Sequence, residues 1–582
     1  MKKGNLNILI GGAAGSGIEK SGHTLTTSFV RGGYKVFANV EHMSQIRHGN
    51  NFLRLRIDKV PHASHVEEID IMVALDRQTI DEHLDEMSEG GVVIFDGEMM
   101  KADENEAAAG SAEGAGKATM IDVPLKKLAE ERLGNPIMAN VITLGIICRI
   151  SGFDIETMKQ VLGKIFAKKG AEIIKLNEKA AEIGYELGEK WEKDFPVKMP
   201  AEKSEQQMFL MGNDATAMGA MKAGVKYVGE YPMTPSSSIL HLMAVWSEKY
   251  EIVVKQTEDE IAACNSIIGA GFAGVRAMAA TSGGGFALMT EAVGLAGMNE
   301  VPVVIVNVMR PGPATGLPTR TEQGDLRQVI HGGQGDPVKI VILPGDVEEC
   351  FSFGFEAFNL AEKYQMPVII CYDKHLGEGY FTAPPFDESG MKIDRGKIPT
   401  EKELAKTGEY KRYLRTEDGI SPRAIPGMKG GIHRATSDEH NEYGDIFEDA
   451  ENRKLMMEKR MKKVEAAVAD TFKPLLIGDE NADVTFVTWG SGKGICLEAA
   501  EILGGQDVKA NVLQIRTAWP FHKKEVLEIL KKCKRPVLVE HNYTGQMGGL
   551  IAEKTGIMIE EKVLRYDGRP MTAKYVIDRI KL

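Results

Sequence analysis

The stretch that decides the fold is residues 253–286, which read VVKQTEDEIAACNSIIGAGFAGVRAMAATSGGGF. A short β-branched run at its start predicts a buried strand, and Glu260 stands where that strand ends. A helix of small residues follows, and a second strand, Ala277–Thr281, runs into Ser282 and three glycines, which let the backbone come close to another group. Open α/β sheets bind ligands at the carboxyl ends of their strands. The stretch therefore predicts a ligand site that contains Glu260.

Glu260 also has a simpler interpretation. An acidic residue at the start of a helix is stabilised by the helix dipole and needs no ligand. For an isolated glutamate this solvated position is the preferred interpretation, whereas the neighbouring glycine turn favours the ligand site. The two interpretations differ in the burial of the side chain, because only the solvated helix start leaves the carboxylate of Glu260 in bulk solvent.

The composition is that of a globular protein with several domains. The chain has 582 residues, of which 43% are hydrophobic and 26% charged, and a formal net charge of −12. This length exceeds what one core supports, and the negative charge argues against a nucleic-acid binder. No apolar run approaches the roughly 20 residues of a membrane span. The first residues lack the pattern of a signal peptide, so we expect a cytoplasmic protein.

The cysteines predict no metal centre on this chain. None of the six lies close enough in sequence to another to form a local iron–sulfur or zinc motif. Each lies in an apolar segment, which is typical of core thiols in a reducing compartment. The six are Cys148, Cys264, Cys350, Cys371, Cys496 and Cys533.

The first predicted unit covers residues 1–190 and begins as a βαβ unit. A strand at 6–11 leads into a glycine turn at 12–22 that is similar to a dinucleotide-binding fingerprint. The next strand does not end on a lone acidic residue, so a structural turn or another phosphate-bearing ligand is favoured over NAD. Residues 191–206 contain two prolines and several charges and predict a linker.

The second predicted unit covers residues 207–390. Its strands are continuous apolar runs, which predict a sheet buried on both faces. Two prolines between Tyr231 and Ser236 keep the backbone out of a helix, and the serines that follow can cap the next one. Arg310 opens a long loop rich in glycine, proline and hydrogen-bonding groups, and such loops tend to shape sites.

The remaining residues predict a connector and a last domain. Residues 391–479 are irregular and then form a charged helix, interpreted as a solvated connector. Residues 480–582 predict a compact α/β domain of three strands. The fold class is therefore α/β, with three α/β domains and mostly parallel sheets.

Four motifs carry a resemblance to a known family. They are Tyr231-Pro-Met-Thr-Pro-Ser-Ser, Glu260 with Gly269 nine positions later, Arg310 with Gly-Leu-Pro-Thr319, and Gln323-Gly-Asp-Leu. The chain resembles the 2-oxoacid:ferredoxin oxidoreductases, which are thiamine diphosphate enzymes, over nearly its whole length. The three units resemble the family's gamma domain, its pyrimidine-binding domain and the transketolase C-terminal domain.

The resemblance implies roles for particular residues. Glu260 matches the acid that bonds a ring nitrogen of the cofactor's aminopyrimidine and favours its imino tautomer, which makes it the catalytic residue. Thr234, Arg310 and Thr319 match residues that hold the substrate, and a guanidinium can bind the 2-oxo carboxylate through two hydrogen bonds. The cofactor-binding residues implied in this way are Glu260, Tyr231, Pro232 and Gly284.

The sequence departs from the family pattern in two places. Ala314 stands where the family loop often has serine, and Gln334-Gly335-Asp336 stands where a histidine often precedes the glycine and the acid. Neither change removes a residue with a predicted chemical role. Both concern the details of substrate selectivity.

The resemblance also implies a partner. The sequence has no Gly-Asp-Gly followed by a distant Asn, the pattern that binds the diphosphate and Mg²⁺. A smaller beta subunit is therefore expected to supply Mg²⁺ and a [4Fe–4S] cluster and to share the thiamine diphosphate, in a dimer of heterodimers. This chain alone is then expected to be inactive.

The reaction implied is the oxidative decarboxylation of a 2-oxoacid with coenzyme A to acyl-CoA and CO2, with reduction of ferredoxin, and it could run in reverse. 2-Oxoglutarate is favoured as substrate, and pyruvate or branched-chain 2-oxoacids are the alternatives. Two other classes stay open: a NAD-linked dehydrogenase that uses the N-terminal glycine turn, and a non-catalytic scaffold subunit that kept the fold.

Overall fold

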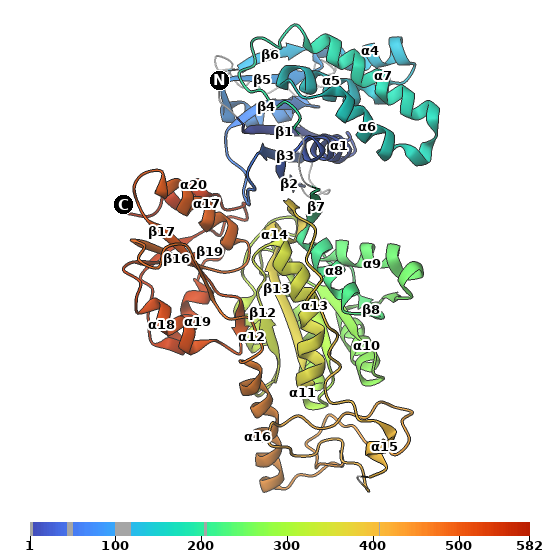
Figure 1. The fold of residues 1–582 in the computed structure, drawn as a ribbon, viewed down its shortest axis with the longest axis vertical. Helices are drawn as coiled ribbons and strands as arrows, with labels where there is room; N and C mark the ends of the chain where they lie inside the picture. The colour runs from blue at the N-terminus through green and yellow to red at the C-terminus, as the bar shows by residue number, and fades with distance from the viewer. Residues whose placement is uncertain (1–3, 43–50, 99–117, 203–205, 407, 582) are drawn as a thin grey trace. The chain divides into compact units, whose positions relative to one another are not determined.

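The computed structural model describes residues 4–42, 51–98, 118–202, 206–406 and 408–581 (Figure 1). The chain separates into two units. The first consists of Met1–Leu210 with Gly379–Pro385, and the second of Met211–Glu378 with Phe386–Leu582. Their sheets confirm the predicted α/β class with mostly parallel pairing, while the predicted domain bounds stay a prediction.

The first unit is built on an eight-stranded mixed sheet. In spatial order its strands are β6 (Ala118–Asp122), β5 (Met87–Phe95), β4 (Ile69–Ala74), β1 (Leu6–Gly12), β3 (Asn51–Asp58), β2 (Lys35–Glu41), β14 (Tyr380–Ala383) and β7 (Met208–Met211). Its helices are α1 (Ile18–Arg31), α2 (Arg77–His83), α4 (Leu125–Leu133), α5 (Ala139–Ser151), α6 (Ile155–Ile165) and α7 (Ala171–Gly188).

The start of the first unit is not the expected βαβ unit. Strand β3 lies between β1 and β2 and is antiparallel to both, so the two strands joined by α1 are not neighbours. A dinucleotide-binding fingerprint needs adjacent parallel strands around its first helix. The strand order therefore favours the structural interpretation of the glycine turn over a NAD site.

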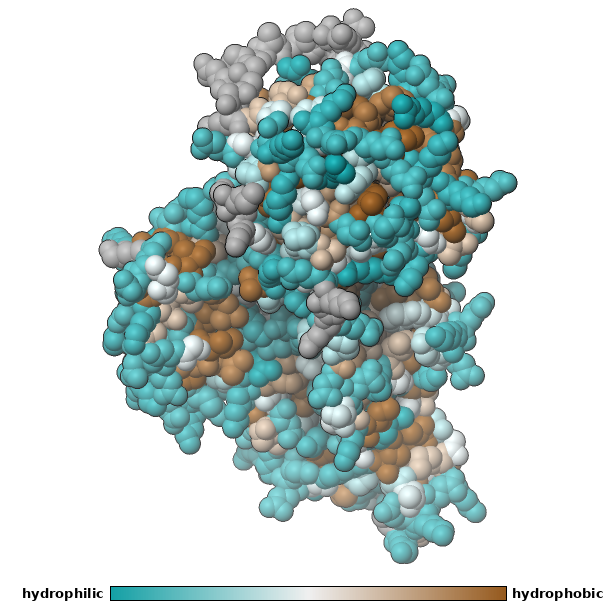
Figure 2. Space-filling view, turned by 45° about the horizontal axis from the view of Figure 1, so that its top comes forward, coloured by the Kyte–Doolittle hydropathy of each residue, from teal (hydrophilic) through white to brown (hydrophobic). Residues whose placement is uncertain are grey.

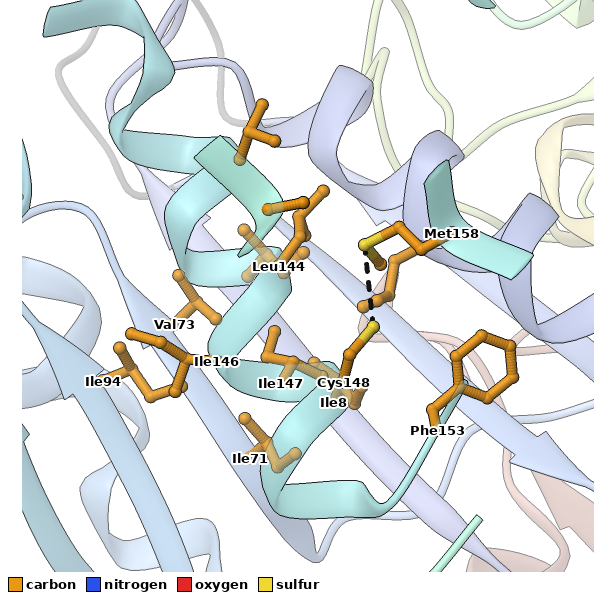
Figure 3. Close-up of a cluster of buried hydrophobic side chains, with 14 of the residues drawn as sticks. Ile8, Ile71, Val73, Ile94, Leu144, Ile146, Ile147, Cys148, Phe153 and Met158 are labelled. Carbon is orange, nitrogen blue, oxygen red and sulfur yellow. Dashed lines mark hydrogen bonds between the residues drawn. The ribbon is translucent and has the colours of Figure 1, made fainter. Parts of the chain in front are cut away.

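The core of the first unit lies between this sheet and α5. Figure 3 shows Ile146 and Ile147 of α5 among Ile8, Ile71 and other strand residues, and a contact of 3.6 Å between the sulfur atoms of Cys148 and Met158. Helices α5 and α7 approach so closely that a Cβ added to Gly184 of α7 would lie 1.8 Å from a backbone oxygen of α5. Glycine at this contact is therefore a requirement of the packing.

The second unit contains a seven-stranded sheet that is parallel except at one edge. In spatial order its strands are β18 (Thr517–Trp519), β12 (Ile340–Ile342), β13 (Pro367–Asp373), β11 (Val303–Met309), β10 (Ala277–Thr281), β8 (Tyr227–Glu230) and β9 (Val253–Gln256). The helices packed on it are α8 (Gly212–Lys222), α9 (Ser237–Tyr250), α10 (Glu260–Phe272), α11 (Gly283–Met298), α12 (Leu326–His331) and α13 (Val347–Tyr364).

The central strands are buried on both faces, as their continuous apolar runs predict. Figure 1 shows α13 lying along β13. The exception is β9, which was expected to be buried. It is an edge strand, and the side chain of Val253 is 59% exposed. The β-branched pattern of this short run does not distinguish an edge strand from a central one.

The C-terminal segment has a five-stranded sheet instead of the expected three strands. In spatial order the strands are β15 (Leu475–Ile477), β17 (Ala510–Gln514), β16 (Val484–Thr488), β19 (Pro536–Glu540) and β20 (Glu561–Leu564). Its helices are α17 (Gly492–Gly504), α18 (Lys523–Leu530), α19 (Gln546–Thr555) and α20 (Ala573–Ile577). Figure 1 shows α17 and α20 on one side of this sheet and α18 and α19 on the other.

The two sheets of the second unit share one hydrophobic core. A single cluster of buried residues includes Phe286 and Ile305 from around the first sheet and Trp489 and Leu538 from the second. Strand β18, from the C-terminal segment, also pairs with β12 of the seven-stranded sheet. The C-terminal segment is therefore packed as part of the second unit.

The connector is tied to the seven-stranded sheet by buried charges. Helix α16 (Ala450–Ala467) places the Nζ of Lys459 at 2.6 Å and that of Lys463 at 3.0 Å from the carboxylate of Glu300. Burial would raise the pKa of Glu300, but Lys459, Lys463 and Arg412 bring it well below its usual value. Burial lowers the pKa of Lys463 to about 7. The interpretation of this helix as only a solvated connector is therefore wrong.

The described residues between β13 and α16 contain three short elements. These are α14 (Lys374–Glu378), then β14, which joins the first sheet, and α15 (Glu401–Leu404), which lies in the connector expected to be irregular. Within the described residues, no helix is both long and apolar enough to cross a membrane. Hydrophilic residues cover most of the face drawn in Figure 2.

Replacing Glu300 tests the buried charge cluster. We expect Glu300→Gln to lower stability by about 3–5 kcal/mol, because two buried ammonium groups would lose their counter-charge. Thermal unfolding followed by calorimetry measures this effect. The control is Lys534→Gln, which removes an exposed ion pair to Asp483 and should leave the melting temperature unchanged. Equal melting temperatures for wild type and Glu300→Gln would contradict the assignment.

Candidate active site

Four neighbouring parallel strands bring the predicted site residues to one edge of the seven-stranded sheet. Strands β9, β8, β10 and β11 are adjacent, and each pairs in parallel with the next. Glu260 follows β9, Tyr231 follows β8, Gly283 follows β10 and Arg310 follows β11. Because the carboxyl ends of parallel strands meet at one edge, residues far apart in sequence gather there.

Glu260 is buried at this edge. The residue is 3% exposed, and its Oε1 has no hydrogen-bond partner among the described residues. The cap of α10 is supplied by Asp259, whose carboxylate accepts a hydrogen bond of 2.7 Å from the backbone N–H of Ala262. Glu260 is therefore neither a solvated residue nor the helix cap, and a buried, unpaired oxygen favours a ligand as its partner.

The glycine segment after β10 is the first turn of helix α11, not a loop. A Cβ on Gly285 would lie 2.1 Å from the Oγ1 of Thr281 and 2.5 Å from the Oε1 of Glu260. A Cβ on Gly283 would collide with Asp325. Gly284 faces open space, with no atom of the chain within 4 Å of such a Cβ. Gly285 therefore makes room for the glutamate, and Gly284 leaves room beside it.

Arg310 is held at the same edge by a backbone contact. Its Nη1 donates a hydrogen bond of 2.8 Å to the carbonyl oxygen of Thr234. This is its only hydrogen bond recorded within the described part of the chain. Burial lowers the pKa of Arg310, while Asp325 and Glu260 oppose that change. The guanidinium thus keeps N–H donors free for a carboxylate ligand.

The loop after Arg310 carries two further carboxyl groups, and Asp325 is the one that interacts with Arg310. Burial raises the pKa of Asp325 to about 6, although Asn307, 3.4 Å away, and Arg310 both act to lower it. Burial raises the pKa of Glu322 to about 7, and Asp325 adds to that increase. Proton binding by Asp325 therefore changes the electrostatic field around Arg310, and Glu322 acts on Asp325.

The loop after Arg310 is fixed by contacts to the C-terminal segment. Gln323 is 1% exposed, and its Nε2 donates to the carboxylate of Asp373 at 3.0 Å and to the carbonyl of Trp489 at 3.1 Å. Its backbone N–H donates to the carbonyl of His541 at 2.6 Å, and the N–H of His541 donates back to its Oε1 at 3.0 Å. One side chain therefore joins three separate segments of the second unit.

The other predicted residues lie less deeply. Tyr231 is 38% exposed, and Pro232 and Thr234 are half-buried on the turn after β8. Thr319 is half-buried, and no hydrogen bond within the described residues joins it to Glu260, Thr234 or Arg310. Its place in the substrate site stays a prediction, as do the roles of Tyr231 and Pro232.

Two acidic residues beside the site were not identified from the sequence. Asp325 belongs to the motif Gln323-Gly-Asp-Leu, but the sequence predicts no chemical role for it. Glu230, the last residue of β8, is fully buried, and neither carboxyl oxygen has a hydrogen-bond partner among the described residues. Burial raises the pKa of Glu230 well above its usual value. A polar residue that ends an apolar strand is the one signal that could have found it.

Helices α10 and α11 carry exposed apolar side chains, from Ile261 directly after Glu260 to Phe272 at the far end of α10. Ile261 is 48% exposed, Phe272 36% and Leu288 49%. Small residues on the same helices, Ala262 and Ala287, are exposed too. The small side chains of α10, expected to allow close packing, therefore face outward on one side. Exposed apolar surface of this kind beside a site marks an interaction surface.

The chain itself offers no metal centre in the part that the structure describes. No group of three or more histidine, cysteine, aspartate or glutamate residues there could hold a metal ion. An organic cofactor fits better. The unpaired Oε1 of Glu260 can accept a hydrogen bond from a ring, and the open space at Gly284 can admit one.

Family models match three parts of the chain. Residues 218–459 match the thiamine diphosphate-binding model of pyruvate flavodoxin/ferredoxin oxidoreductase, and residues 7–187 match the pyruvate ferredoxin/flavodoxin oxidoreductase model. Residues 475–575 match the transketolase C-terminal domain.

Curated relatives and a solved structure agree with these models. The chain is 35% identical over 616 residues to a 2-oxoacid:ferredoxin oxidoreductase subunit alpha from Sulfolobus, covering 97% of this chain and 95% of that one. It is 36% identical over 351 residues to the 2-oxoglutarate synthase subunit KorA of Methanothermobacter thermautotrophicus, covering 59% of this chain and 89% of that one. It also matches the structure of 2-oxoglutarate:ferredoxin oxidoreductase from Magnetococcus marinus with 2-oxoglutarate, coenzyme A and succinyl-CoA bound, with a TM-score of 0.90, 31% identity and 99% of each chain covered.

The two neighbouring glycines of α11 should differ sharply on substitution. We expect Gly285→Ala to lower the melting temperature, because its methyl group would collide with Thr281 and Glu260 inside the protein. Gly284→Ala should fold with an unchanged melting temperature, since its methyl group meets no atom of the chain. Differential scanning calorimetry of both variants measures this. Equal effects of the two substitutions would contradict the packing described.

Proposed function

The chain belongs to the 2-oxoacid:ferredoxin oxidoreductase family, and we propose that it is the large subunit of a complex that converts 2-oxoglutarate and coenzyme A into succinyl-CoA and CO2. The electrons released pass to ferredoxin through the partner, and the reaction can run in reverse. The observation that carries the proposal is the buried, unpaired carboxyl oxygen of Glu260. It lies at an edge where four strands gather further polar groups.

Glu260 has the position needed to activate thiamine diphosphate. When bound, this cofactor supplies the nucleophilic carbon that attacks the keto group of the substrate. The carboxylate of Glu260 would accept a hydrogen bond from the pyrimidine ring and would favour its imino tautomer. Gly285 makes room for this carboxylate, and Gly284 leaves space for the ring. Tyr231 and Pro232 are proposed to line the pocket from the turn after β8.

Arg310 is proposed to bind the carboxylate next to the keto group. One of its N–H groups holds the carbonyl of Thr234, and the remaining donors can bind a carboxylate through two parallel hydrogen bonds. The hydroxyl groups of Thr234 and Thr319 are proposed to bond the carboxylate or keto oxygen. The charge of Asp325 acts on the guanidinium and thereby adjusts how strongly it holds an anion.

A second polypeptide is proposed to complete the site. Residues that are 36–49% exposed on α10 and α11 form an apolar surface at the site's edge, which a partner would cover. The sequence lacks the motif for Mg²⁺ and the diphosphate, so we assign Mg²⁺ and the [4Fe–4S] cluster to a smaller beta subunit. We propose a dimer of these heterodimers.

The choice of 2-oxoglutarate rests on names given to relatives. The similar Magnetococcus enzyme was solved with 2-oxoglutarate, coenzyme A and succinyl-CoA bound, and the Methanothermobacter relatives are named 2-oxoglutarate synthase subunits. Pyruvate and branched-chain 2-oxoacids are the alternatives. We also propose a cytoplasmic location, because all six cysteines are free thiols. The NAD-linked dehydrogenase is disfavoured by the strand order of the first unit.

Removing the carboxylate tests the proposed function. In the complex reconstituted with its beta subunit, we expect Glu260→Gln to lower turnover by about 10²–10⁴-fold, because the amide cannot replace the carboxylate as proton partner. Assembly, followed by size-exclusion chromatography, should be unchanged. The control is Glu258→Gln, an exposed acid on the same turn. Equal turnover in Glu260→Gln and wild type would remove Glu260 from the mechanism.

A substrate panel tests the specificity. With coenzyme A and a viologen dye as electron acceptor, we expect kcat/KM for 2-oxoglutarate to exceed that for pyruvate and branched-chain 2-oxoacids by about tenfold or more. Steady-state rates with each acid measure the ratio. A higher kcat/KM for pyruvate would assign the pyruvate alternative and leave the role of Glu260 intact.

A further inference from the structure

The turn that contacts Arg310 is itself held by a buried asparagine. Asn213 is the second residue of α8 and is fully buried. Its Nδ2 donates one hydrogen bond of 2.8 Å to the carbonyl oxygen of Pro235 and another of 2.8 Å to the Oγ of Ser238. Both partners belong to the segment that follows β8 and carries Thr234. Asn213 therefore joins α8 to the turn that contains a proposed substrate residue.

The oxygen of the same amide is bound from within the sheet. The hydroxyl group of Tyr372, on β13, donates a hydrogen bond of 2.8 Å to the Oδ1 of Asn213. The Oγ1 of Thr216 lies 3.1 Å from this hydroxyl and donates to the carbonyl of Gly212 at 2.9 Å. Tyr372 and Thr216 are both fully buried. The asparagine is therefore fixed at both ends of its amide group, away from solvent.

The chemistry of an amide matches this place closely. An asparagine side chain offers two N–H donors and a carbonyl acceptor on one planar group. Here both donors meet acceptors on the turn, and the acceptor meets the Tyr372 hydroxyl. An aspartate would instead set a carboxylate oxygen against the Pro235 carbonyl. The space is also small, because a Cβ added to Gly377 would lie 3.0 Å from the Oδ1 of Asn213.

Pro235 passes this restraint on to Thr234. The proline ring fixes the φ angle of Pro235, so only its ψ angle separates its own carbonyl from the peptide group that contains the carbonyl of Thr234. On the other side, the turn is closed by Ser236, whose backbone N–H and Oγ both donate to the carbonyl of Met233 at 2.8 Å. The hydrogen bond from Asn213 therefore restrains the direction of the Thr234 carbonyl.

The Thr234 carbonyl is the group that Arg310 binds, at 2.8 Å from its Nη1. A guanidinium must present two parallel N–H groups to bind a carboxylate. Displacing the carbonyl would turn the guanidinium away from that orientation, and small displacements of a positioning group are costly in an enzyme site. A series of hydrogen bonds thus leads from Tyr372 through Asn213 and the turn to Arg310.

We propose that Asn213 is a positioning residue that orients Arg310 for the carboxylate of the 2-oxoacid by way of the Thr234 carbonyl. This inference deepens the proposed function and rests on it. No hydrogen bond within the described residues joins the Asn213 side chain to Arg310 or Glu260, so it acts through the turn. Its loss therefore weakens the binding of the substrate and leaves the chemistry at Glu260 intact, which raises KM more than it lowers kcat.

Steady-state kinetics of the complex assembled with its beta subunit tests this inference. We expect Asn213→Ala to raise KM for the 2-oxoacid about tenfold and to change kcat by less than about threefold. Tyr372→Phe removes only the hydroxyl that holds the amide, so it should raise KM by a smaller factor, and it tests the inference by itself if Asn213→Ala does not fold.

The matched control is Thr216→Val, which removes a buried hydroxyl from the same helix and leaves both bonds from Asn213 to the turn. Its KM for the 2-oxoacid should equal that of wild type. Unchanged KM in Asn213→Ala and Tyr372→Phe would overturn the inference. An equal rise of KM in Thr216→Val would also overturn it, because the effect would then be a general loosening of α8.

Hydrogen exchange separates this inference from the proposed function, because it needs no substrate. In the full chain, followed by mass spectrometry, the backbone amides of residues 233–240 should exchange about threefold or more faster in Asn213→Ala than in wild type or Thr216→Val. Unchanged exchange would overturn the inference even in a complex that oxidises 2-oxoglutarate. Faster exchange in Asn213→Ala, with a wild-type complex that oxidises no 2-oxoacid, would support the restraint on the turn and overturn the proposed function.

Discussion

The structure depends on a carboxylate that is buried without a partner. Leaving a buried polar oxygen unpaired costs on the order of 1–3 kcal/mol, and the chain gives the Oε1 of Glu260 no hydrogen bond among its described residues. The parallel sheet fixes the backbone of Glu260, Asp259 takes over the helix cap, and Gly285 clears the space that the side chain fills. A ligand that donates a hydrogen bond to this oxygen would offset the cost, so the burial of Glu260 favours ligand binding at this place.

The loop after Arg310 is held in place by contacts to both sheets of the second unit. The loop from Arg310 to Leu326 must hold its polar groups beside Glu260, and a free loop of that length would not do so. Gln323 fixes it by hydrogen bonds to Asp373, Trp489 and His541, all from other segments. Both contacts to His541 are made by its backbone N–H and carbonyl groups, whose position is set by the end of β19. The shared core gives these contacts a rigid base.

Sequence reasoning located the strand ends that carry the candidate site residues better than it predicted the pairing of the strands. The placement of Glu260, the turn at Tyr231 and the loop after Arg310 follow from local patterns, because strand ends and glycine turns are marked in sequence. The errors concern long-range pairing. Strand β3 inserts between β1 and β2, and β14 joins a sheet whose other strands are mostly far away in sequence. Short edge strands such as β20, with Glu561 and Lys562, have no apolar run to mark them. The burial of Glu230 and the position of Asp325 arise only from tertiary packing.

The most direct measurement is an electron cryo-microscopy structure of this chain assembled with its beta subunit and thiamine diphosphate. The account predicts that a carboxylate oxygen of Glu260 lies about 2.6–3.2 Å from a ring nitrogen of the cofactor's pyrimidine. It also predicts that the beta subunit covers the apolar face of α10 and α11. A cofactor bound elsewhere, with the Glu260 carboxylate paired to a group of its own chain, would contradict the account.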